Sequence, residues 1–93
     1  MFKNAKYLTR GVQSEIPIEL QLFMWGCIGS VPDPDYLQIF RLEPMKTMQK
    51  IIHEQEEPEY RKEYLLKSDA PITAKVYIID DGEHSTMLLA EEY

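Results

Sequence analysis

The feature that most limits how this chain can fold is a segment, residues 17–29, that is apolar on two opposite sides of a helix. Pro17 suits the first helical turn because its fixed φ matches a helix, and Glu19 adds a favourable negative charge there. At about 100° per residue, one face carries the side chains expected to cover the core, which are Leu20, Phe23, Met24, Cys27 and Ile28. The opposite side carries a second stripe, formed by Ile18, Leu22 and Trp25. Such a helix needs two packing partners.

Chain length decides whether both partners can come from one molecule. The 93 residues suffice for one globular domain, residues 1–93, with one hydrophobic core. A single helix on a single sheet buries one helix face, so we expect the stripe of Ile18, Leu22 and Trp25 to remain exposed and to act as an interface. The alternative is that the N-terminal residues, the segment before Pro44 or a strongly curled sheet cover the stripe.

The segments on either side of this helix are typical of strands. Residues 5–12 predict a first strand, with Gly11 as a bulge or as the strand end. After a turn rich in proline and aspartate, residues 36–42 predict a central strand, because apolar side chains occupy both of its faces. Pro44 is expected to end this strand.

Residues 47–67 allow two interpretations. As strands, residues 47–56 and 59–67 form a hairpin that turns at Glu57-Pro58. As helices, Pro44 and Pro58 each occupy a first turn, and Met45, Met48 and Ile52 follow at helical spacing. The hairpin is favoured because Ile51 and Ile52 are β-branched and the tyrosines that follow alternate.

The last part of the chain predicts a second hairpin. Residues 72–79 and 86–90 are strand-like and flank Asp81-Gly82, a strong turn signal. The whole predicts an α+β domain in which one α-helix, about residues 17–29, packs on an antiparallel sheet of about five to six strands. The expected order is β-α-β-β-β-β-β, with the strands after the helix forming a meander.

Charge is distributed unevenly along the chain. The net charge is −6, of which residues 1–30 contribute +1 and residues 31–93 contribute −7. This acidity disfavours a nucleic-acid binder, because such proteins gain most of their affinity from Lys and Arg. An acidic decoy for a DNA-binding protein remains an interpretation, and it requires one continuous stripe made of Glu54, Glu56, Glu57, Glu59, Asp80, Asp81 and Glu83.

Cysteine content and hydropathy indicate where such a chain functions. The single Cys27 cannot form an internal disulfide, and no apolar leader follows the first residues, so a cytoplasmic location is expected. The longest nearly apolar stretch, residues 20–31, is much shorter than the roughly 20 residues that span a bilayer, which argues against a membrane protein.

Candidate chemical groups are few and scattered. His53 and His84 lie far apart in the sequence with no further ligand at zinc spacing, so neither a metal site nor a cofactor is expected. Cys27 lies on the core face of the helix, where burial disfavours a reactive thiolate. The one local concentration of hydrogen-bonding groups suggests a ligand site at His53, Gln55 and Tyr60. Strand geometry puts His53 and Gln55 on one face and Glu54 on the other.

Several blocks of sequence together resemble one bacterial family of about this size. The blocks are Tyr7-Leu-Thr-Arg-Gly11, Ile16-Pro-Ile-Glu-Leu-Gln21 with Trp25, Tyr36-Leu-Gln-Ile-Phe40, Ile51-Ile-His-Glu-Gln-Glu56 with Pro58 and Tyr60, and Met87-Leu-Leu-Ala-Glu-Glu-Tyr93. They cover nearly the whole chain and resemble the family called domain of unknown function 960. The resemblance implies a small cytoplasmic bacterial protein and supplies no catalytic residues.

Two functional hypotheses follow from these patterns. The first is a small non-enzymatic protein-interaction module, which could be a homodimer, that binds a protein partner or a second copy through Ile18, Leu22 and Trp25. The alternative is a small enzyme or ligand-binding protein whose site lies around residues 53–60. The sequence favours the interaction module, because no nucleophile, base or metal ligands are clustered in it.

Overall fold

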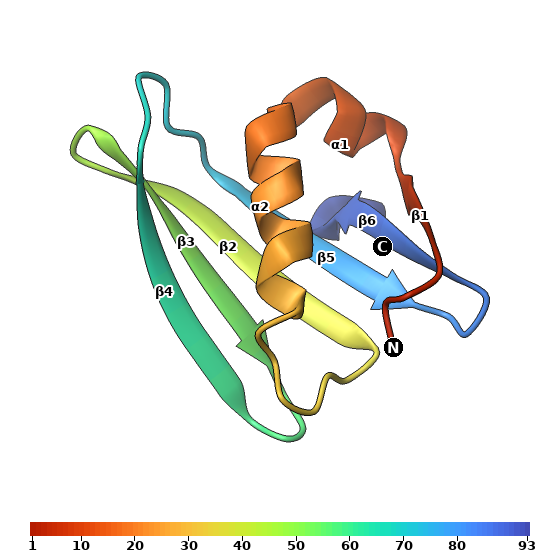
Figure 1. The fold of residues 1–93 in the computed structure, drawn as a ribbon. Helices are drawn as coiled ribbons and strands as arrows, with labels where there is room; N and C mark the ends of the chain where they lie inside the picture. Colours follow the sequence, from red (N-terminus) through yellow and green to blue (C-terminus); the bar gives the residue numbers. More distant parts are fainter.

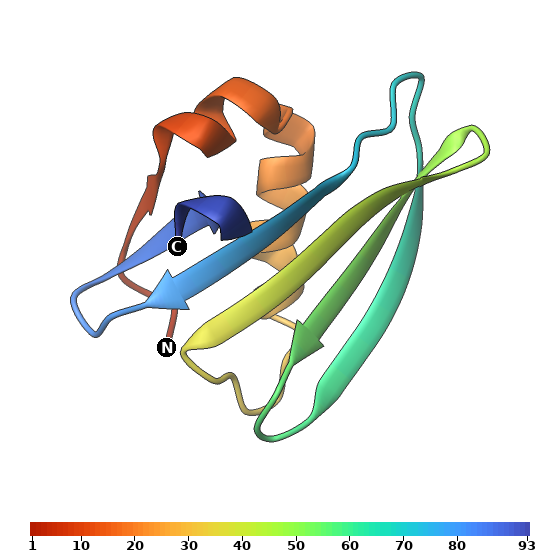
Figure 2. The ribbon, with the colours of Figure 1, turned by 180° about the vertical axis from the view of Figure 1, so that it is seen from behind.

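The computed structural model describes residues 1–93 and places a six-stranded sheet behind two helices that cover one of its faces (Figure 1). In chain order the elements are β1 (Ala5–Leu8), α1 (Arg10–Glu15), α2 (Ile18–Ile28), β2 (Leu37–Met45), β3 (Met48–Gln55), β4 (Tyr60–Lys67), β5 (Ala74–Asp80), β6 (His84–Leu89) and the 3-10 helix η1 (Ala90–Glu92). Seen from behind, the other face of the sheet shows no helix beyond the short η1 (Figure 2). The architecture is α+β, as predicted.

The strands are ordered β1-β6-β5-β2-β3-β4 in the sheet. The hairpin predicted for residues 47–67 is confirmed by the antiparallel pairing of β3 with β4, and the hairpin around Asp81-Gly82 by the pairing of β5 with β6. In two places the sheet differs from an antiparallel meander. β5 pairs with β2 instead of β4, and β1 runs parallel to β6 at one edge.

Side-chain burial explains why β5 lies next to β2. β5 places fully buried Val76 and Ile78 on the core side of the sheet, which suits a central strand. β4 suits an edge because its charged side chains are exposed and discourage further strand pairing; they are Arg61, Lys62, Glu63 and Lys67. The segment that crosses from β4 to β5 is held by Gln49, whose side chain accepts a hydrogen bond from the Ile72 backbone N–H at 2.7 Å and donates one to its carbonyl at 3.0 Å.

The first predicted strand is too long, because the chain leaves the sheet after Leu8 and enters α1. Thr9 is the N-cap of this helix, and its hydroxyl accepts a hydrogen bond from the backbone N–H of Val12 at 3.3 Å. Gly11 is therefore helical and is not a bulge. A Cβ at this position would lie 2.6 Å from Glu92 Oε2, so the glycine permits a close approach of α1 to the C-terminal residues.

The prediction that Pro44 ends its strand is also wrong. Pro44 lies within β2, opposite Gln49 of β3. β5 pairs with β2 only as far as Leu42, so Pro44 sits where the strand has a neighbour on one side alone. A residue that lacks an N–H is tolerated at such an edge position. The proline therefore removes no hydrogen bond from the central part of the sheet.

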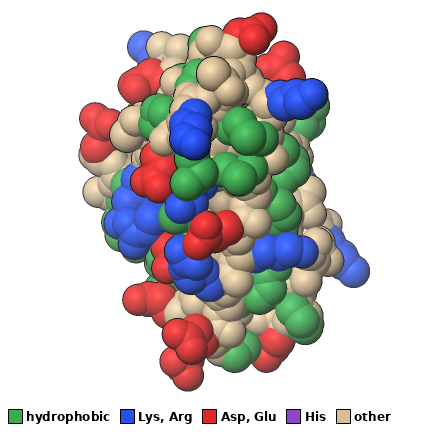
Figure 3. Space-filling model, turned by 90° about the vertical axis from the view of Figure 1, so that its left-hand side faces the viewer, with side chains coloured by type: hydrophobic (Ala, Val, Ile, Leu, Met, Phe, Trp, Pro, Cys, Tyr) green, Lys and Arg blue, Asp and Glu red, His purple; other side chains and the backbone are tan.

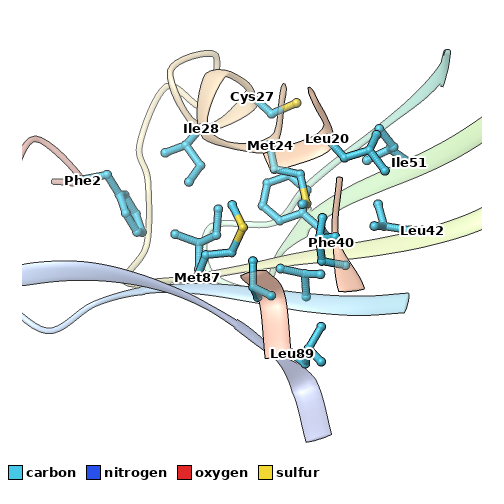
Figure 4. Packing of buried hydrophobic residues seen from close by; sticks show 14 residues of the cluster. Phe2, Leu20, Met24, Cys27, Ile28, Phe40, Leu42, Ile51, Met87 and Leu89 are labelled. Atoms are coloured by element: carbon cyan, nitrogen blue, oxygen red, sulfur yellow. The ribbon is translucent and has the colours of Figure 1, made fainter. Parts of the chain in front are cut away.

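Helix α2 agrees with its prediction to within one residue, with Pro17 as the N-cap. Four of the five side chains expected to cover the core are buried, and Phe23 is half-buried. The core lies between α2 and the sheet (Figure 4), where Met24 of α2, Phe40 of β2 and Met87 of β6 are inaccessible to solvent. None of the helices combines the length and the apolar character needed to cross a membrane.

Candidate functional site

The predicted stripe on α2 points away from the core. Ile18 and Leu22 are 58% and 65% exposed, which are high values for large apolar side chains on a protein's longest helix. Trp25 is half-buried and packs against the edge of the core cluster. The alternative that N-terminal residues cover the stripe holds only for Trp25, because the Lys6 Nζ atom of β1 lies 5.6 Å from the centre of its ring. Ile18 and Leu22 remain uncovered.

Neighbouring residues enlarge this apolar surface. Leu8 of β1 is 41% exposed and lines a hollow of about 490 Å³ together with Ile18. A second hollow, of about 470 Å³, borders Trp25 and is lined by the N-terminal segment and by the loop after α2. Gly26, the residue after Trp25 in α2, is exposed, and a Cβ added to it would meet no atom within 4 Å. We define the outward face of α2 as Ile18, Leu22, Trp25 and Gly26.

Charged side chains flank the outward face and form no ion pairs. Glu15 and Glu19 lie near its Ile18 end, and Lys3 and Lys6 lie near its Trp25 end. All the ion pairs of the structure lie elsewhere, within β2, β3 and β4 and at the turn before β6. The charges around the outward face are therefore available to a partner. Lys3, Lys6 and Glu15 were not predicted to lie beside the stripe, since the two lysines are placed by the pairing of β1 with β6 and Glu15 by helix α1, which was not predicted.

The acidic residues of β3, β4 and the last hairpin do not form the continuous stripe that a DNA decoy requires. Glu54 pairs with Arg41 at 2.7 Å, and Asp81 accepts hydrogen bonds from the backbone N–H groups of Glu83 at 2.9 Å and of His84 at 3.0 Å. Asp80 is buried and accepts a hydrogen bond from the backbone N–H of Phe2 at 2.7 Å. Figure 3 shows Lys and Arg side chains among the Asp and Glu side chains on the side of the molecule where β4 lies. This mixture of charges removes the basis of the decoy interpretation.

The second candidate region is a buried polar network around His53. The His53 Nε2 atom lies 2.7 Å from Gln38 Oε1, and the amide nitrogen of Gln38 donates to Gln55 Oε1 at 2.6 Å. Gln55 in turn donates to the carbonyls of Asp33 at 3.1 Å and of Pro58 at 2.8 Å. The structure thus joins His53 and Gln55 on one face of β3, as predicted. Through Gln55, this network anchors the loop before β2 and the turn before β4.

Gln38 links the two predicted residues, and the sequence analysis missed it. The sequence does contain a signal for it, because Gln38 lies on the same face of the strand as Tyr36, Phe40 and Leu42, and that face was expected to be apolar. A polar side chain at such a position must find a hydrogen-bonding partner in the core.

His53 itself is closed to solvent. Its ring stacks on Phe40 with the ring centres 4.3 Å apart, and it packs edge to face with Tyr60, whose ring centre is 5.3 Å away. Burial lowers the pKa of His53 to about 4, so the imidazole is neutral at neutral pH. Its Nδ1 atom has no hydrogen-bonding partner. The nearby hollow of about 230 Å³ is lined by Gln55 and Tyr60 but not by His53. The geometry therefore supports a structural role for His53 better than a ligand-binding role.

Other reactive groups are equally enclosed or dispersed. Cys27 is buried against the sheet, and burial raises the pKa of its thiol, as expected for a side chain on the core face. Burial also raises the pKa of the neighbouring Tyr64 to about 12. No three His, Cys, Asp or Glu side chains lie together in a way that could hold a metal ion. The outward face of α2 is thus the surface of the molecule that most needs a functional explanation.

Comparisons with known proteins place the chain in a family. No curated protein matches this sequence at a significant level. A solved structure, the crystal structure of the protein of unknown function from Enterococcus faecalis, has the same fold with a TM-score of 0.83 and 24% sequence identity, covering 97% of this chain and 91% of that one. The family model described as staphylococcal protein of unknown function (DUF960) matches residues 5–92. The chain therefore belongs to the DUF960 family, as its sequence blocks predict.

Proposed function

We propose that this protein is a small non-enzymatic interaction module that binds a protein partner through the outward face of α2. One observation carries the proposal. Ile18 and Leu22, four residues apart on the longest helix, are both more than half exposed, although the chain has only 93 residues with which to build its core. Contiguous apolar surface of this kind marks interaction sites on soluble proteins.

The make-up of the surface supports this proposal. Side chains at positions i and i+4 of a helix lie side by side, so Ile18 and Leu22 form one ridge. Trp25 adds an aromatic side chain, a type enriched among the residues that contribute most to binding energy. Gly26 leaves room for a partner to approach the helix backbone closely. Charges without ion-pair partners surround the apolar centre, as in the polar rim of an interface.

A pair of matched leucine substitutions tests the proposal. Leu22 and Leu65 are exposed leucines, 65% and 49% accessible, but Leu65 lies on β4, away from α2. Affinity capture from the native host with the wild type, Leu22→Ser, Trp25→Ser and Leu65→Ser compares the proteins that each one retains. We expect Leu22→Ser and Trp25→Ser to lose specifically bound protein that the wild type and Leu65→Ser keep. Identical captured proteins from all four folded variants would overturn the proposal.

A further inference from the structure

We propose that the occupant of the outward face is a second copy of this chain, bound with the two α2 helices antiparallel across a two-fold axis at Leu22. This inference rests on the proposed function and adds the identity of the partner and its orientation. The charge distribution motivates it, because the surface carries acidic residues at one end and basic residues at the other. A two-fold axis brings the acidic end of one copy against the basic end of the other.

The spacing along α2 matches this symmetry. Leu22 lies midway between Ile18 and Gly26. With the axis at Leu22, each Ile18 side chain meets Gly26 of the second copy. Gly26 is the position where an added Cβ would find open space, so a large side chain can pack there against the backbone. The two Leu22 side chains meet each other at the axis.

The same arrangement pairs the charges. Glu15 lines the hollow beside Ile18, and Lys6 lines the hollow beside Trp25, with its Nζ atom 5.6 Å from the centre of the indole ring. Residues of β1 line both hollows, so both lie on the same flank of α2, and the two-fold axis sets Glu15 of one copy against Lys6 of the other. The symmetry forms this contact twice. Within one chain Lys6 donates only to backbone carbonyls, at 3.3 Å and 3.5 Å, and Glu15 forms no ion pair. Lys3 lines the same hollow as Lys6 and adds a second positive charge there.

A second copy fits this surface better than an unrelated acidic peptide. An acidic peptide would pair with Lys3 and Lys6 but would also face the carboxylates of Glu15 and Glu19 along the same ridge. Only a partner with the opposite order of charges satisfies both ends, and an antiparallel second copy supplies that order. One helix face and its rim form a small interface, so we expect dissociation in the micromolar range.

The decisive experiment combines charge reversal with mixing of full-length variants. Sedimentation equilibrium from about 1 to 500 μM should show reversible dimers of the wild type. Glu15→Lys and Lys6→Glu each place like charges at both contacts and should weaken dimerisation by about tenfold or more. In an equimolar mixture, a Glu15→Lys chain facing a Lys6→Glu chain has opposite charges at both contacts. The mixture should therefore recover the wild-type dimer, although neither variant dimerises alone.

Controls separate this effect from general changes in charge or fold. Glu56→Lys and Lys67→Glu reverse exposed charges that are remote from α2, and both should dimerise like the wild type. Circular dichroism melting checks that every variant is folded. A wild-type chain that stays monomeric up to 500 μM overturns this inference, while the proposed function then stands or falls on the capture experiment with Leu22→Ser. A dimer that tolerates both charge reversals, or a mixture that fails to recover it, overturns the antiparallel arrangement.

Discussion

His53 illustrates how burial alone sets the chemistry of a side chain in this fold. The ring has no exposed surface, it stacks on Phe40, and its pKa falls to about 4 from an ordinary value of 6.5. The unfolded chain binds a proton at this residue as the pH falls through 6.5, whereas the folded chain does so only near pH 4. The stabilisation that neutral His53 provides is therefore complete above pH 6.5 and is lost as the pH falls towards 4.

We expect the free energy of unfolding to drop by about 2 kcal/mol between pH 7 and pH 5 because of this residue. Hydrogen bonds lower the pKa values of Asp80, Asp81 and Glu92, and those carboxylates lose their contribution mainly at lower pH. Urea unfolding at the two pH values measures the drop. His53→Gln, which carries no titrating group, should show a much smaller change. A wild type whose stability is the same at both pH values would contradict the buried, neutral imidazole.

Alanine substitutions at two helical glycines, Gly11 and Gly26, should change the stability of the protein in opposite directions. A Cβ at Gly11 would displace Glu92, which accepts hydrogen bonds from Thr9 at 2.6 Å and from the backbone N–H of Leu89 at 2.8 Å. Gly11→Ala should therefore destabilise the fold by about 1 to 3 kcal/mol. Gly26→Ala meets no atom within 4 Å and should stabilise helix α2 by about 0.5 to 1 kcal/mol. Thermal melting at low micromolar concentration measures both, and equal effects would refute the proposed packing of α1 on the C-terminal residues.

The elements that could be predicted from the sequence are those with local signals. Helix α2 has a proline at its start and apolar residues at helical spacing, and the hairpins have turn residues between strand-like runs. The strand order could not be predicted, because the pairing of β5 with β2 and of β1 with β6 joins segments far apart in the chain. Gly11 was misassigned for the same reason, since the contact that requires it comes from Glu92 at the other end of the sequence. The stripe on α2 was predicted, but the charges around it were not.

At the scale of elements, Gln49 holds the segment that crosses from β4 to β5, and its substitution tests this role. The side chain is 1% exposed and bonds to both backbone groups of Ile72, at the point where the chain crosses from β4 to β5. Gln49→Ala leaves these groups without their partner and should destabilise the fold by about 2 to 4 kcal/mol. The Ile72 amide should also exchange its hydrogen faster. Gln13→Ala, at an exposed position, serves as the control, and equal stability of the two variants would contradict the role of Gln49.

At the scale of the whole molecule, charge and apolar surface are divided between two regions. Lys50 and five other charged side chains of β2, β3 and β4 form ion pairs within these strands, of which Arg61 with Glu63 at 2.6 Å is the shortest. Around α2 the charges form no ion pair, and the two most exposed aliphatic side chains of the helix lie between them. A small domain with a single helix layer cannot cover that face alone. Association is therefore expected on the outward face of α2.

Trp25 allows the most direct measurement of this central claim, because it is the only tryptophan in the chain and it borders the proposed axis. Sedimentation equilibrium and Trp25 fluorescence are recorded over the same concentration series for the wild type and for Leu22→Ser. The account predicts that the wild-type mass doubles from 11.0 kDa while the Trp25 emission shifts to shorter wavelength in step with it. Leu22→Ser should stay monomeric with unchanged emission. A mass of 11.0 kDa and a constant emission spectrum for the wild type at every concentration would contradict it.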